Sequence, residues 1–137
     1  MFATPDEAEE AFYTAFANTN LDAMMAVWLD SDAITCVHPV GPRIGGVQAV
    51  RASWAEIFRN SGGLRFRLGE VNRTQDALLA IHVLHEHIIV PGETGERPPT
   101  VATNIYQLTK EGWRMILHHA SPVATPASPQ RPATLLH

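Results

Sequence analysis

The sequence contains one cysteine, Cys36, among its 137 residues. A single cysteine excludes a disulfide within the chain and a zinc site built from several thiolates. Its neighbours Thr35 and Val37 are β-branched, which is typical of a buried strand rather than of an exposed reactive thiol. We therefore expect Cys36 to contribute to the core.

Long apolar runs are also absent. No stretch approaches the roughly 20 residues that a helix needs to cross a bilayer. The first residues, Met1 to Glu7, lack the basic start and the apolar segment of a secretory signal. The sequence therefore predicts a cytoplasmic protein without a membrane partner.

Basic residues are outnumbered, since 10 Lys and Arg face 14 Asp and Glu for a net charge of -4. A charge of this sign opposes binding to a polyanion. The one basic alternation, Arg65-Phe66-Arg67, is followed by Leu68, so its even positions have the pattern of the buried side of a strand. We expect no nucleic-acid partner.

Three segments have apolar residues at helical spacing. The first begins at Thr4-Pro5-Asp6-Glu7, which combines a capping residue, a proline at the first helical position and a glutamate three residues after the cap. A second, short helix is expected after Asn20. A third is expected from Val47 to Arg59, ending at Asn60-Ser61-Gly62-Gly63.

The remaining segments alternate with a period of two, which is typical of strands. A short strand is expected before the third helix and four longer ones after it, at Ala33–His38, Leu64–Asn72, Leu78–Val90, Thr100–Thr109 and Trp113–Ser121. Turn-like connections between the last four indicate an antiparallel meander. The predicted fold class is α+β, in the order helix, helix, strand, helix and four strands, with three helices packed in a strongly curved antiparallel sheet.

The character of the sequence changes after Pro122. Residues 123–137 are rich in proline and alanine and have no apolar period. We expect residues 1–122 to form one α+β domain and residues 123–137 to form an extended or disordered tail.

Several phrases in this order resemble the SnoaL-like, nuclear transport factor 2-like superfamily: His38-Pro39-Val40-Gly41, Gly45-Gly46, Gly112-Trp113-Arg114 and His118-His119-Ala120-Ser121-Pro122. The resemblance implies a cone with an internal pocket at its wide end, and a homodimer formed through the outer face of the sheet. Members include steroid isomerases, polyketide cyclases, dehydratases and non-catalytic modules, so the fold alone does not name a function.

Two positions differ from members of that superfamily. Ketosteroid isomerases carry their carboxylate base in an Asp-Pro dipeptide where this chain has His38-Pro39. The association domain of calcium/calmodulin-dependent protein kinase II has a pocket arginine where this chain has Asn104. The resemblance therefore implies a pocket whose chemistry differs from both.

The register of the last hairpin groups its polar residues. A two-residue or a four-residue turn around Glu111-Gly112 places Asn104 and His119 on one face and His118 on the other. His119 and His38 are then candidates for acid–base catalysis, with Asn104 orienting an imidazole or binding a developing oxyanion. The alternative is that His119 is a hydrogen-bonded strand histidine within a polar cluster.

Glu86 joins the same face if Val90 lies opposite Thr100, whereas a slip of one residue brings His85 and His87 there instead. The expected ligand-binding wall consists of Tyr13, Phe16, Trp28, Trp54, Glu86, Tyr106 and Leu117.

Six of the seven histidines fall on predicted strands or strand ends, but no single face receives the whole set, so we expect no metal and no cofactor. The predicted function is binding of a small, largely apolar molecule, with isomerisation, dehydration or cyclisation by histidine acid–base chemistry. A non-catalytic binding or dimerisation module and a histidine-ligated metal enzyme are the alternatives.

Overall fold

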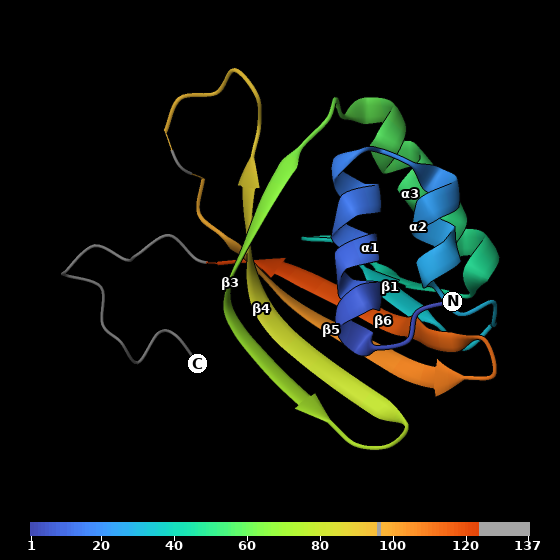
Figure 1. Ribbon diagram of the computed structural model, residues 1–137. Helices are drawn as coiled ribbons and strands as arrows, with labels where there is room; N and C mark the ends of the chain where they lie inside the picture. Colours follow the sequence, from blue (N-terminus) through green and yellow to red (C-terminus); the bar gives the residue numbers. More distant parts are fainter. Residues whose placement is uncertain (96, 124–137) are drawn as a thin grey trace, which may run out of the picture.

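The computed structural model describes residues 1–95 and 97–123. In this part of the chain, three helices lie on the concave side of a curved six-stranded sheet (Figure 1). The helices are α1 (Pro5–Ala17), α2 (Leu21–Val27) and α3 (Val47–Asn60). The predicted α+β class and the order of the helices are confirmed.

The helix starts follow the capping signals in the sequence. The hydroxyl of Thr4 accepts a hydrogen bond from the backbone N–H of Glu7, and the side chain of Asn20 does the same for Ala23. Helix α3 begins after Gly46, whose φ of 88° suits a residue without a Cβ. Local sequence therefore fixes where each helix begins.

The strands are β1 (Thr35–Val37), β2 (Arg43–Gly45), β3 (Arg65–Gln75), β4 (Leu79–Ile89), β5 (Thr100–Thr109) and β6 (Gly112–Pro122). Their order in the sheet is β2-β1-β6-β5-β4-β3, so the four long strands form the predicted meander. The sheet is not wholly antiparallel, because β1 pairs with β6 in parallel. The short strand β2 lies between the predicted strand Ala33–His38 and the third helix, where no strand was predicted, and it pairs with β1.

Two β-bulges interrupt the meander. On β3, Glu70 and Val71 lie opposite Leu84 alone, and on β6 the extra residue is Ile116. An extra residue bends its strand, increases the twist and reverses the side-chain faces beyond it. The bulges therefore contribute to the curvature seen in Figure 1 and decide which side chains point inward.

The core lies between the helices and the concave face of the sheet. Phe12 and Trp54 are fully buried, and their rings meet edge to face with centroids 5.6 Å apart. Phe16 packs on Trp54 in the same way at 4.8 Å. Burial of each such ring stabilises the fold by roughly 1.5–3 kcal/mol, so this aromatic cluster holds α1 and α3 on the sheet.

The N-terminal segment adds a bridge between Phe2 and Gly112 at the turn of the last hairpin. Among the described residues, no helix is long and apolar enough to cross a membrane. The tail predicted for residues 123–137 falls, apart from Val123, outside the described residues.

Candidate functional site

A row of polar side chains crosses the inner face of the sheet. The register places His82 of β4 opposite Asn104 of β5, Asn104 opposite His118 of β6, and His118 beside Cys36 of β1. All four side chains are buried, with 1%, 0%, 1% and 0% of their surface exposed. Buried polar groups need partners, so the hydrogen bonds of this row define the site.

The register of the last hairpin differs from the prediction. His118 faces inward opposite Asn104, while His119 is exposed and Leu117 is half-buried on the outer face. The bulge at Ile116 is the cause, since one extra residue moves every later side chain of β6 to the other face. The expectation that His119 and Leu117 belong to the pocket is therefore corrected, and His118 takes the inward position.

A hydrogen-bonded chain of four side chains joins α1 to three strands. The Tyr13 hydroxyl donates to Oε2 of Glu86 at 2.6 Å, and Nδ2 of Asn104 donates to the Tyr13 oxygen at 2.9 Å. Nδ1 of His118 lies 2.6 Å from Oδ1 of Asn104. Because that amide oxygen can only accept, Nδ1 carries a hydrogen and Nε2 of His118 has its lone pair free.

We call these four residues, Glu86, Tyr13, Asn104 and His118, the Tyr13 network. Burial raises the pKa of Glu86 to about 7, against the lowering influence of the hydrogen bond from Tyr13. Burial lowers the pKa of His118 to about 3, with further contributions from His38 and His119. Near neutral pH the imidazole of His118 is therefore uncharged, and the carboxyl of Glu86 is present in both its protonated and its ionised form.

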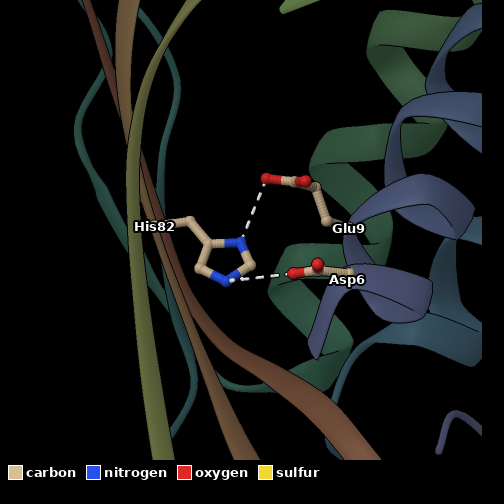
Figure 2. Close-up of side chains that lie close together, drawn as sticks. All are labelled: Asp6, Glu9 and His82. Carbon is tan, nitrogen blue, oxygen red and sulfur yellow. Dashed lines mark hydrogen bonds and ion pairs between the residues drawn. The ribbon is translucent and has the colours of Figure 1, made fainter. Parts of the chain in front are cut away.

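A second cluster joins Asp6 and Glu9 of α1 to His82 of β4 (Figure 2). Nδ1 of His82 donates to Oε1 of Glu9 at 3.0 Å, and Nε2 lies 3.8 Å from Oδ1 of Asp6. Arg73 of β3 reaches both acids, at 2.7 Å from Glu9 and 3.2 Å from Asp6. Burial alone raises the pKa of Glu9, but the hydrogen bonds from His82 and Arg73 outweigh it and leave this pKa lowered.

The three possible ligand atoms of Asp6, Glu9 and His82 lie within 4.8 Å of one another, as a metal site requires. The guanidinium of Arg73 already contacts both carboxylates, so a cation would have to displace it. The cluster is better described as an internally paired link between α1 and the sheet.

Tyr106 stands between the two clusters. Its ring centroid lies 5.1 Å from that of His82, and its buried hydroxyl has no hydrogen-bond partner among the described residues. Burial raises the pKa of Tyr106, and the charge of Glu9 raises it further. The residue was expected in a ligand-binding wall, and it lies instead deep in the core.

His38 follows β1 and is half-buried. Its Nε2 lies 3.0 Å from Oγ of Ser53, which itself donates to the carbonyl of Val50, so Nε2 of His38 carries the hydrogen. The ring packs edge to face on Trp54 at 4.8 Å, and 6.5 Å separates it from the ring of His118. Burial lowers the pKa of His38, which favours the neutral form of this imidazole.

The expected internal pocket is largely filled by side chains. Phe16 and Trp54 pack on each other, and Phe16 packs on Phe66 at 4.6 Å, in the space between the sheet and the helices. Trp28 lies elsewhere and lines a separate hollow with Met25 and neighbours on α3. Tyr13, another predicted wall residue, lines a groove between α1 and β3.

That groove, which we call the α1–β3 groove, has a volume of about 590 Å³. Its apolar wall includes Ala17, Leu64, Phe66 and Leu68, and Tyr13 forms part of its floor. The buried Glu9 also lines the groove, and further polar groups come from Glu10, Thr14, Asn18 and Arg65. The groove thus leads from solvent to the phenol of the Tyr13 network.

Sequence reasoning found Asn104, Glu86 and Tyr13 and missed His118, His82 and Glu9. Val90 does not lie opposite Thr100 as the prediction for Glu86 assumed; Glu86 itself pairs with Thr100, and because this shift is an even number of residues, Glu86 stays on the face of Asn104. Glu9 lies four residues before Tyr13 on one face of α1, a spacing that was visible in the sequence. His118 had no local signal, since a bulge in β6 decides its direction.

Residues 6–126 match the family model of the SnoaL-like domain, so the chain belongs to that family. The predicted superfamily is thereby confirmed. The boundary at residue 122 stays a prediction, because the match extends slightly beyond it.

Two solved structures are similar over most of the chain. One, from Thiobacillus denitrificans ATCC 25259, is provisionally named a calcium/calmodulin-dependent protein kinase type II association domain; it is 41% identical with a TM-score of 0.86, over 90% of this chain and 98% of that one. The other, from Streptomyces avermitilis, is provisionally named a dehydratase of the NTF2-like family; it is 30% identical with a TM-score of 0.78, over 89% and 100% of the two chains.

A curated relative, the F-box protein SKIP8 of Arabidopsis thaliana, is 28% identical over 110 residues, or 80% of this chain. The chain spans 46% of the length of that relative.

Proposed function

We propose that this domain binds a small, largely apolar molecule in the α1–β3 groove and performs an acid–base step on it through Tyr13 and Glu86. One observation carries the proposal: Tyr13 lines the groove, and its hydroxyl donates to the buried carboxyl of Glu86. A molecule in the groove would therefore meet a phenol backed by an acid. Apolar walls with few polar groups are typical of small-molecule sites.

The carboxyl of Glu86 suits acid–base catalysis better than the histidines do. A catalytic acid or base works best when its pKa is near the pH of the reaction, and the pKa of Glu86 is about 7. His118, with a pKa of about 3, is too weak a base. We therefore place the proton transfer on Glu86, and assign His118 and Asn104 the positioning of Tyr13.

Dehydration illustrates the step. The Glu86 carboxylate takes the proton next to the carbonyl of a β-hydroxyketone, which gives an enolate. The enolate then expels the hydroxyl as its C–O bond breaks, Tyr13 gives this hydroxyl its proton so that water leaves, and the proton on Glu86 passes to Tyr13, which restores the starting state. The similarity to a chain provisionally named a dehydratase supports this class of reaction, and isomerisation or cyclisation uses the same transfers.

A panel of small cyclic β-hydroxyketones tests the chemistry, with formation of the conjugated enone followed by its absorbance. We expect turnover to fall by about 100-fold or more in Glu86→Gln and in Tyr13→Phe. The matched control is Glu56→Gln, because Glu56 is exposed on α3. If turnover is equal in all variants, the acid–base step is wrong.

Binding is tested separately. Thr14 is exposed on α1 and lines the groove, so Thr14→Trp fills it without changing the network. We expect the thermal shift caused by a bound panel member to disappear in Thr14→Trp and to persist in Glu56→Trp. If the thermal shift persists in both variants, the ligand binds elsewhere. His38 does not line the groove, so the thermal shift should persist in His38→Gln, and its loss there would show that His38 takes part in ligand binding.

The outer face of the sheet supports a second role, self-association. Ile81, Ile105 and Leu117 lie side by side on three neighbouring strands of that face, and Ile81 is 40% exposed. An apolar stripe in this position suits a second copy of the chain. The 41% identity to a chain provisionally named an association domain is consistent with that role.

Sedimentation equilibrium of the wild type and of Ile81→Lys tests self-association. We expect a dimer for the wild type and a monomer for Ile81→Lys, with Thr14→Lys on the helical side as the control. A monomeric wild type at concentrations up to about 100 μM would contradict this role.

A further inference from the structure

A second hollow lies at the edge of the sheet, away from the α1–β3 groove. Its volume is about 160 Å³, and it is bounded by the facing ends of β3 and β4 and by the segment that follows β4. Arg67 comes from β3, His87 from β4, and Glu93, Gly95 and Arg97 from the segment after it. We call this hollow the edge pocket.

Arg67 and His87 supply two nitrogen donors at the edge pocket, and both side chains lie close to Gly69. A Cβ added to Gly69 would lie 3.1 Å from Nε2 of His87 and 3.8 Å from Nη1 of Arg67. The imidazole of His87 thus packs closely over Gly69 with the guanidinium of Arg67 near it, and the register places His87 and Arg67 opposite each other. Neither side chain forms a hydrogen bond within residues 1–95 and 97–123.

Among the described residues that line the edge pocket, the charges leave a positive balance. Glu93 and Arg97 neutralise each other through two hydrogen bonds, from Nε at 2.8 Å and from Nη2 at 2.5 Å. Arg67 has no ion pair within the described residues. The rigid fork of a guanidinium matches the two oxygens of a carboxylate or phosphate, so an unpaired Arg67 facing an enclosed space favours an oxyanion.

We propose that the edge pocket binds the carboxylate or phosphate group of a small anion, with Arg67 and His87, which both line the pocket, as its donors. The pair formed by Glu93 and Arg97 closes one side of the pocket. The site is independent of the function proposed for the α1–β3 groove, because the two hollows have no lining residue in common.

Amide chemical shifts of the ¹⁵N-labelled chain test the proposal, with sodium phosphate and sodium acetate as probes and sodium chloride at equal ionic strength as the reference. We expect saturable changes at Gly69, Gly95 and Arg97. Stronger binding of phosphate than of acetate would assign a phosphate ligand, and the reverse order a carboxylate ligand. The absence of saturable changes beyond those caused by chloride, for both anions, would overturn the proposal.

Three variants identify the donors. Arg67→Gln should weaken binding about tenfold, the effect of losing one charge-assisted hydrogen bond. Gly69→Ala should weaken binding as well, because its φ is not positive and alanine fits the backbone, while the new methyl group displaces His87. Arg43→Gln is the control, since Arg43 is exposed on β2 at the opposite edge of the sheet. Equal weakening in Arg67→Gln and Arg43→Gln would show nonspecific attraction and refute the site.

Discussion

The buried carboxyl of Glu86 makes the stability of this protein depend on pH. Only 3% of Glu86 is exposed, and burial raises its pKa from 4.5 to about 7. Below pH 4.5 this carboxyl is protonated in both the folded and the unfolded chain. Between pH 4.5 and 7 the unfolded chain loses the proton and the folded chain keeps it, so the contribution of Glu86 to stability is lost as the pH rises.

The size of the effect follows from the pKa difference. A difference of about 2.5, at about 1.4 kcal/mol for each pKa unit, corresponds to about 3 kcal/mol of unfolding free energy. Glu86→Gln removes the ionisable group and keeps an oxygen that accepts the hydrogen bond from Tyr13. Relative to the wild type, this variant should gain about 3 kcal/mol between pH 4.5 and pH 8.

His118 changes the pH dependence of stability in the opposite direction, so its contribution has to be separated from that of Glu86. Its pKa falls from 6.5 to about 3, so the unfolded chain binds a proton that the folded chain does not, and stability rises between pH 3 and 6.5. In the wild type the two trends oppose each other between pH 4.5 and 6.5. The difference between the wild type and Glu86→Gln isolates the carboxyl, because both chains contain His118.

Urea unfolding at 25 °C, followed by tryptophan fluorescence at half-unit steps from pH 4.5 to 8, measures this difference. The free energies of the two chains should diverge steadily up to about pH 7 and then run parallel. A difference that is independent of pH would refute the assignment of Glu86 as a buried carboxyl titrating near neutrality.

Three further predictions concern stability and reactivity. Tyr13→Phe keeps the ring but leaves two buried partners of the hydroxyl without their hydrogen bond. The free energy of unfolding in urea should therefore fall by about 1–3 kcal/mol. An unchanged free energy would contradict the Tyr13 network. Gly112→Ala adds a Cβ 2.6 Å from the carbonyl oxygen of Phe2 at a φ of 88°; the thermal midpoint should fall by several degrees, and an unchanged midpoint would argue against this contact. The thiol of Cys36 is fully buried and burial raises its pKa to about 12, so Ellman's reagent should label it only after unfolding, and rapid labelling of the native chain would show that it is accessible.

Local sequence carried most of the secondary structure. The cap at Thr4, the proline after it and the cap at Asn20 act within one turn of helix, so α1 and α2 begin where the sequence predicts. The period of two likewise marked the four long strands, and β5 has the predicted bounds. Pairing between distant segments had no such signal, which is why the parallel contact of β1 with β6 and the strand β2 were not predicted.

The sequence by itself determined the fold class, the burial of Cys36 and the inward position of Asn104, because each depends on patterns within a few consecutive residues. Only the tertiary structure decided which histidine meets Asn104. The choice between His118 and His119 depends on one extra residue in β6, and a bulge is stabilised by the packing of the whole sheet rather than by its own sequence. The same packing brings α1 against β4, and so gives Glu86 its partner Tyr13, which is 73 residues away in the chain.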